Sequence, residues 1–142
     1  MKTVRTMIAI CLLFATATLF GQTESKWLMK VHIPFSFNVV DRPMPGGIYN
    51  VYTVGSERIV RITNVDGKHT AIVNTQPNYS TSVSPAAHLA FMAYADEYAL
   101  TQIWVGGEDF SRNLSLGKKA TELARAGNVA RTTVVGAIGD NR

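Results

Sequence analysis

The clearest pattern in the chain is an alternation of apolar and polar residues between positions 27 and 39. Every second residue there is apolar: Trp27, Met29, Val31, Ile33, Phe35, Phe37 and Val39. A strand with this period turns one face towards a core and the other towards water. These 13 residues would extend over about 40 Å, longer than most strands. Because Pro34 lacks an amide hydrogen for a sheet ladder, we expect a strand that bends there and enters two sheets.

Further stretches rich in β-branched and aromatic residues follow, each bounded by a turn sequence. The proline and glycine content of residues 41–47 predicts a turn there, and Asp66-Gly67 is a dipeptide that tight hairpins favour. A polar loop is expected at 76–84. We expect strands at 48–54, 58–64, 69–75 and 98–105. The first three of these form a meander, since only short turns separate them.

Residues 85–100 fit two different elements. Ser84 followed by Pro85 is typical of the start of a helix. The alternation over 89–93 is typical of a strand that turns at 96–97. The residue pattern alone leaves helix and strand open.

The C-terminal part predicts a helix over 116–126 whose apolar stripe would cover one open end of a barrel. Gly127 ends this helix, and residues 128–142 form a frayed tail in which 131–135 could add a short edge strand. The apolar stripe consists of Leu116, Ala120, Leu123 and Ala124. Together the elements predict an all-β fold, a small antiparallel barrel or two-sheet sandwich of about six to seven strands with one short C-terminal helix.

The first 21 residues have the composition of a secretory signal peptide. Lys2 and Arg5 precede a 14-residue apolar run, which is shorter than a bilayer-spanning helix needs to be. Cleavage is expected after Ala17 or Gly21. Residues 22–127 would then form an exported domain in the periplasm, the outer envelope or the medium.

Loss of that segment would change the available chemistry. Cys11 is the only cysteine, so the exported domain would have no disulfide, thiolate nucleophile or cysteine-based zinc site. Without Lys2 and Arg5, the 14 basic residues become 12 against 10 acidic ones, a formal charge of +2. The remaining basic residues are scattered, with Lys118-Lys119 the densest pair. Nucleic-acid binding needs a clustered basic face and is therefore not expected.

Three short motifs occur in a distinctive order: IPFSFNV at 33–39, PGGIYNV at 45–51 and QIW at 102–104. This order resembles a group of small exported proteins of unknown function, abundant in acidobacterial genomes, with the pattern IPFxFxV, PxGxYxV and QIW. Where that group has Leu-Pro-Ala-Gly, this chain has Met-Pro-Gly-Gly at 44–47, and the charged motif after the last glycine is degraded. The resemblance implies a strand at 85–95, and it implies no activity.

Two sets of titratable residues are candidate metal sites. The histidines at 32, 69 and 88 lie on three expected strands, without the spacing of zinc ligands. The acidic pairs at 96–97 and 108–109 could hold calcium, or act as a glycosidase carboxylate pair, if both loops met at one end of a barrel. The sequence contains no calcium-loop pattern and no GxSxG nucleophile motif. We therefore expect no catalytic residue, no metal and no cofactor.

A weaker candidate is a ligand or partner surface built from aromatic and charged side chains. Its members would be Tyr49, Tyr52, Tyr94, Tyr98, Trp104, Glu108, Asp109 and Arg112. Aromatic residues on alternating strands also fill cores and form cross-strand pairs, which is their more common role.

The expected function is an exported non-catalytic β-domain, envelope-associated or secreted, that binds or supports an unknown macromolecule. The alternative is a periplasmic carrier of a small apolar ligand in a β-barrel cavity. A lined cavity of roughly several hundred Å³ favours the carrier, whereas a solid core with an exposed apolar patch favours the binding module. Membrane contact is expected only through the signal peptide during export.

Overall fold

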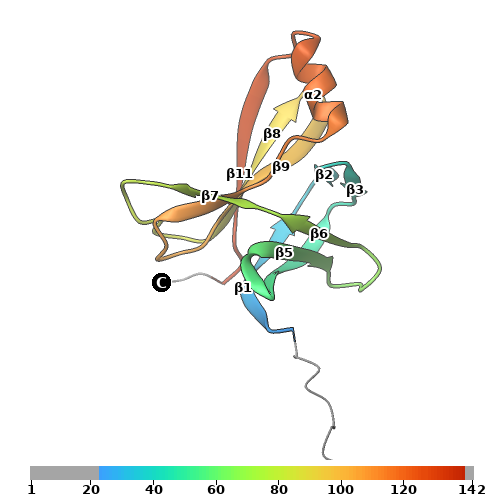
Figure 1. Cartoon of the computed structure of the whole chain (residues 1–142). Coiled ribbons are helices and arrows are strands. Elements are labelled where there is room, and N and C mark those ends of the chain that lie inside the picture. The colour runs from blue at the N-terminus through green and yellow to red at the C-terminus, as the bar shows by residue number, and fades with distance from the viewer. Residues whose placement is uncertain (1–22, 140–142) are drawn as a thin grey trace, which may run out of the picture.

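Two β-sheets face one another in the computed structural model, which describes residues 23–139 (Figure 1). The four-stranded sheet has the order β1 (Ser25–Ile33), β4 (Gly47–Val54), β5 (Ser56–Asn64) and β6 (Thr70–Asn74). The seven-stranded sheet has the order β11 (Ala130–Gly136), β8 (His88–Tyr94), β9 (Glu97–Trp104), β10 (Phe110–Asn113) and β7 (Gln76–Tyr79). Beside β9 it also contains β2 (Phe37–Val39) and β3 (Arg42–Met44). The described strands form a two-sheet sandwich and no closed barrel.

The long alternating segment is divided between the two sheets at Pro34, as the missing amide hydrogen predicts. Its first part, β1, pairs antiparallel with β4, and its second part, β2, pairs with β3 and β9. The connection between the halves therefore ties the sheets together. All described strand pairs are antiparallel except the single contact of Asn38 with Ala99.

The space between the sheets is filled by side chains from both. Val31, Ile33, Tyr49 and Val51 from the four-stranded sheet are fully buried, as is Phe91 from the seven-stranded one. Phe35 and Phe37 each make an edge-to-face contact with Phe91. The core is therefore solid, and a ligand site has to lie outside it.

The segment at 85–100 is a strand pair rather than a helix, which confirms what the resemblance implies. β8 and β9 are joined by a two-residue turn at Ala95-Asp96, because Tyr94 pairs directly with Glu97. The sandwich has more strands than expected. The sequence pattern did not predict the short strands β3, β7 and β10, and it predicted β2 only as the second half of the bent strand. In the C-terminal segment, the edge strand that residues 131–135 could add is present as β11, which pairs with β8 over its whole length.

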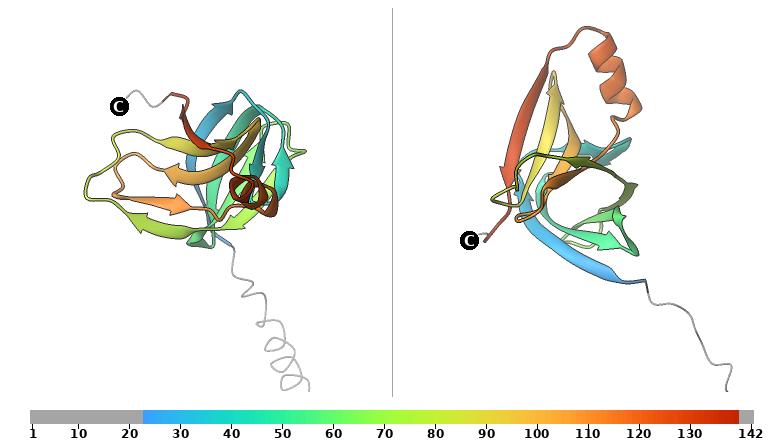
Figure 2. Two further views of the ribbon diagram at one scale, coloured as in Figure 1. Left: turned by 90° about the horizontal axis from the view of Figure 1, so that it is seen from above. Right: turned by 60° about the vertical axis from the view of Figure 1, so that its left-hand side comes forward.

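The helix α2 (Lys118–Arg125) is shorter than the predicted 116–126 and does not cover a barrel end. The strands β8, β9 and β11 extend past the four-stranded sheet, and α2 lies at their far end (Figures 1 and 2). There Ala120 is buried against Tyr94 and Ala99. The Asp41 carboxylate accepts a hydrogen bond from the Lys118 amide at 2.6 Å, so the start of the helix is fixed to the β2–β3 turn. No helix within residues 23–139 has the length and apolar character needed to cross a membrane.

Candidate binding groove

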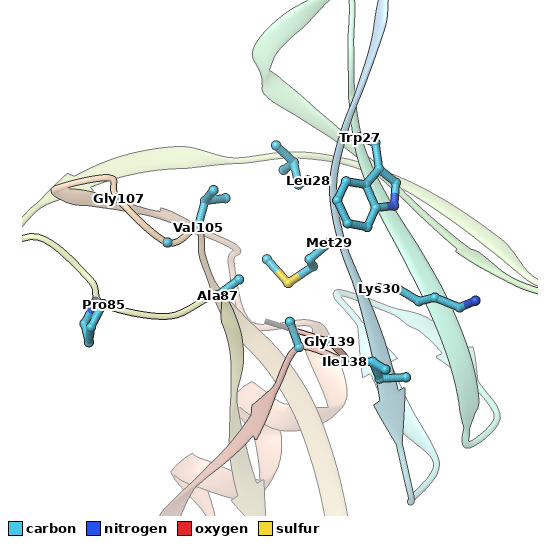
Figure 3. A pocket seen from close by; sticks show the side chains of 12 residues that line it. Trp27, Leu28, Met29, Lys30, Pro85, Ala87, Val105, Gly107, Ile138 and Gly139 are labelled. Carbon is cyan, nitrogen blue, oxygen red and sulfur yellow. The ribbon is translucent and has the colours of Figure 1, made fainter. Parts of the chain in front are cut away.

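A groove of about 360 Å³ lies at the seam where β1 meets one end of the seven-stranded sheet (Figure 3). Leu28 and Met29 of β1 point into it from one side, and Ala87 and Val105 point into it from the other (Figure 3). Its lining is completed by Trp27, Lys30, Pro85, Gly106, Gly107, Ala137, Ile138 and Gly139. The groove thus combines three segments far apart in sequence: β1, the ends of β8 and β9, and the chain after β11.

A β-bulge in β1 supplies the groove with one of its apolar side chains. Trp27 pairs with Tyr52 and Met29 with Val51, so Leu28 is the extra residue on the bulged strand. A bulge changes the phase of the alternation, and Leu28 and Met29 are both buried, at 7% and 1% exposure. Leu28 is the one apolar residue out of phase with the alternating pattern, and the bulge explains its position.

The chain after β11 closes the other end of the groove. The Ala137 amide donates to the Ala87 carbonyl at 3.0 Å, and the Ile138 amide donates to the Lys30 carbonyl at 2.8 Å. These two hydrogen bonds connect β1 to the seven-stranded sheet, next to the isolated pairing of Val31 with Ala137. The width of the groove is therefore set by backbone hydrogen bonds rather than by flexible side chains.

Two large apolar side chains at the rim remain accessible to solvent. Trp27 is 55% exposed and Ile138 is 48% exposed. The Trp27 indole nitrogen donates to the Asn50 side-chain oxygen at 3.4 Å, which orients the ring. A molecule entering the groove would cover apolar surface on both, and removal of that surface from water is favourable.

The groove is nearly free of titratable groups. Among its lining residues only Lys30 carries an ionisable side chain, and in Figure 3 this side chain points away from the centre. Proton transfer and nucleophilic attack need such groups within hydrogen-bond reach of a bound molecule. The geometry is therefore suited to holding an apolar group rather than to acid–base chemistry.

The aromatic residues of the sequence-predicted surface do not come together. Tyr49 is fully buried, and Tyr94 is buried under α2, so neither contributes to a surface. The Tyr98 ring stacks on Phe35, with ring centroids 4.0 Å apart, and therefore packs against the core. Tyr52 and Trp104 lie on different sheets, where Tyr52 contacts Arg61 and Trp104 stacks on His88.

Of the predicted charged residues, Glu108 and Arg112 do meet, in a cluster built around the buried Arg112 guanidinium. The Arg112 side chain is only 1% exposed and donates to Glu108 Oε2 at 2.8 Å. It also donates from Nε to the Glu57 carbonyl at 3.0 Å and from a terminal nitrogen to the Glu57 carboxylate. Because Glu57 belongs to β5, the cluster joins the two sheets. Asp109 is exposed and does not belong to this cluster.

The candidate metal ligands are also dispersed. The acidic pairs at 96–97 and 108–109 flank opposite ends of β9 and therefore cannot share one cation. His69 contacts Asp66, and His88 contacts Trp104. Within residues 23–139 no group of three or more His, Cys, Asp or Glu is placed to hold a metal ion.

Glu97 and Asp66 each have a local partner that lowers the pKa of the carboxyl. A hydrogen bond from the Lys119 ammonium, at 2.7 Å, is the main reason that the Glu97 pKa lies below its ordinary value. The Asp66 pKa is lowered chiefly by a hydrogen bond from the Lys68 amide. The Lys119–Glu97 hydrogen bond holds α2 against β9, and the Lys68–Asp66 hydrogen bond stabilises the turn between β5 and β6.

The groove could not be found from residue types, because its floor consists of ordinary apolar side chains. Compared with protein families, curated proteins and solved structures, the chain matches none.

Proposed function

We propose that this chain is exported after removal of residues 1–21, which lie outside the described part, and acts as a non-catalytic binding module. Its binding site is the groove of Figure 3, and its ligand is the apolar part of a partner molecule. The observation that carries this proposal is the convergence of Leu28, Met29, Ala87 and Val105 on one open groove, with a rim of exposed Trp27 and Ile138. The resemblance to small exported proteins supports the same assignment.

The volume and position of the groove bear on the alternative function. About 360 Å³ falls at the lower end of the roughly 300–1,000 Å³ typical of ligand sites. A carrier of the expected kind would enclose its ligand within a closed barrel, whereas the described strands form a sandwich with a filled core. We therefore favour a module that holds an apolar chain at the seam over a carrier that encloses one.

The two tryptophans allow a direct test. Trp27 lies at the rim of the groove and Trp104 on a different sheet, so a Trp104→Phe variant leaves Trp27 as the only tryptophan emitter. We expect neutral 1-decanol to shift Trp27 emission to shorter wavelength in a saturable manner. A charged probe is unnecessary, since the centre of the groove has no charged side chain.

A matched pair of substitutions locates the binding. In the Trp104→Phe background, Ala87→Leu adds volume inside the groove, whereas Ala90→Leu adds the same volume to a separate pocket of about 300 Å³. Both alanines are buried, at 7% and 5% exposure. Ala87→Leu should weaken decanol binding at least tenfold and Ala90→Leu less than twofold. Equal effects of the two substitutions, or no saturable shift in the parent, would overturn the proposal.

A further inference from the structure

Away from the Glu57 end of β5, the outward face of the four-stranded sheet carries no carboxylate. Its residues follow from the alternation of burial along β1, β4, β5 and β6, in which buried positions face the core. Away from the sheet end that holds Ser25 and Glu57, the outward positions are Trp27, Lys30, His32, Ile48, Asn50, Tyr52, Val54, Ile59, Arg61, Thr63, Thr70, Ile72 and Asn74. We call these thirteen residues the basic face, because every fixed charge on it is positive.

One row of directly paired residues crosses the basic face from edge to edge. Trp27 pairs with Tyr52, Tyr52 with Arg61, and Arg61 with Ile72. Directly paired residues in antiparallel strands share a face, so these four side chains lie side by side. Three strand spacings of ~4.8 Å make the row about 14 Å wide. Both ends are apolar and accessible, with Trp27 at 55% and Ile72 at 66% exposure.

The cation in this row is held in place without a carboxylate. The Arg61 guanidinium lies over the Tyr52 ring, 4.9 Å from its centroid, which is the geometry of a cation–π contact. Within residues 23–139 no ion pair involves Arg61 or Lys30. The hydrogen-bonding capacity of the guanidinium is therefore directed to solvent or to a bound anion.

The nearest acidic groups lie at the margins of this face and already have partners. Glu57 accepts from Arg112 and lies 3.7 Å from Lys26. Asp66, in the β5–β6 hairpin, contacts His69 and accepts from the Lys68 amide. The positive charge of the basic face is therefore not neutralised from its own edges.

We propose that the basic face docks on an anionic membrane surface. Charge complementarity favours an anionic partner, and each Lys or Arg near such a surface contributes attraction at close range. The exposed apolar ends of the row favour a bilayer, because Trp belongs to the headgroup region and Ile72 can enter it. An acidic polysaccharide would satisfy the cations but would leave Ile72 without an apolar partner. The proposal goes beyond the sequence-based expectation that membrane contact occurs only during export.

This inference is separate from the proposed function, although Trp27 borders both the groove and the basic face. The test therefore uses Lys30, Arg61 and Ile72 and leaves Trp27 unchanged. Decanol binding by Trp27 tests the groove, whereas vesicle binding tests the basic face, so either can fail alone. The chain from Thr23 to Arg142 is used, since every described strand, the helix and the core lie within it.

Co-sedimentation with vesicles measures the docking. We expect at least tenfold tighter binding to phosphatidylglycerol–phosphatidylcholine (1:1) vesicles than to phosphatidylcholine alone. Lys30→Gln/Arg61→Gln should weaken binding to the anionic vesicles at least tenfold. The control Lys118→Gln/Arg131→Gln removes the same amount of charge from α2 and β11. It should change binding to the anionic vesicles less than threefold.

A second pair of variants tests the apolar contribution. Ile72→Asp should weaken vesicle binding at least tenfold. The control Val134→Asp, at a 59%-exposed position of β11, should change vesicle binding less than threefold. The proposal is overturned if both double variants lose binding equally, or if neutral vesicles bind as tightly as anionic ones. Binding to polygalacturonate with none to vesicles would also overturn it. Circular dichroism of each variant confirms that the sheets are intact.

Discussion

Arg112 is the residue whose replacement should most clearly destabilise the sandwich. Its buried guanidinium contacts the Glu57 carbonyl, the Glu57 carboxylate and the Glu108 carboxylate, so one side chain joins β5 to the β9–β10 connection and β10. It also lies over the Phe110 ring, 4.9 Å from the centroid. Arg112→Met keeps most of the aliphatic volume and removes all of these polar contacts.

The exposure of the two carboxylates sets how much free energy of unfolding Arg112→Met should remove. Removal of one partner from a buried ion pair costs about 3–5 kcal/mol when the other partner stays buried. Here Glu57 is 58% exposed and Glu108 is 22% exposed, so both carboxylates can regain contact with water. The expected loss is therefore about 3 kcal/mol, at the lower end of that range. Arg112→Lys should cost about 1–2 kcal/mol, because it keeps a charge but loses the fork of donors.

Urea unfolding followed by tryptophan fluorescence measures these losses. Lys119→Met is the control, since the Lys119–Glu97 pair is exposed and should contribute about 1 kcal/mol or less. A loss below 1 kcal/mol for Arg112→Met would refute the argument that this cluster joins the sheets. An equal loss for Arg112→Met and Arg112→Lys would show that packing, rather than the forked hydrogen bonds, is responsible.

Three further changes test other parts of the fold. Gly117→Ala would place a Cβ 2.1 Å from the Val40 carbonyl oxygen, so we expect it to lower the free energy of unfolding by about 2–3 kcal/mol and to reduce helical circular dichroism. Tyr49 donates to a backbone carbonyl at 2.5 Å, and burial raises its pKa. Tyr49→Phe should cost about 1 kcal/mol, and in an alkaline absorbance titration of the native protein it should remove a phenol that ionises above the ordinary tyrosine pKa. The pKa of Glu97 is lowered by Lys119, so its stabilising effect is present above the unfolded-state pKa and is lost as the pH falls through the folded-state pKa. The stability difference between the parent and Glu97→Gln should therefore be present at neutral pH and shrink towards zero in acid, and a difference independent of pH would contradict this account.

Much of the fold was predictable because alternation records which side of a strand is buried. The long segment around Pro34 predicted a bent strand that feeds two sheets, and β1 and β2 have that arrangement. The meander over 48–75 was predictable because short turns leave few ways to pair three consecutive strands. The short strands β2, β3, β7 and β10 were missed as separate elements, since three or four residues carry too little periodicity.

The site was far less predictable than the fold. Arg112 looks like a surface residue in the sequence, and only the approach of Glu57, 55 positions away, explains its burial. Leu28 is a single apolar residue out of phase, which becomes informative only once the bulge is known. The row from Trp27 to Ile72 depends on the register of four strands, and residue types alone do not fix a register.

The central claim is that the groove at the seam is the binding site, and three methionines allow it to be tested directly. Met29 lines the groove, whereas Met44 and Met92 line two other pockets. With ¹³C-methyl-labelled methionine in the chain from Thr23 to Arg142, each pocket has its own NMR signal. On titration with 1-decanol we predict a saturable shift of the Met29 methyl signal, with Met44 and Met92 unchanged. A saturable shift of Met44 or Met92 without one at Met29 would contradict the assignment of the groove.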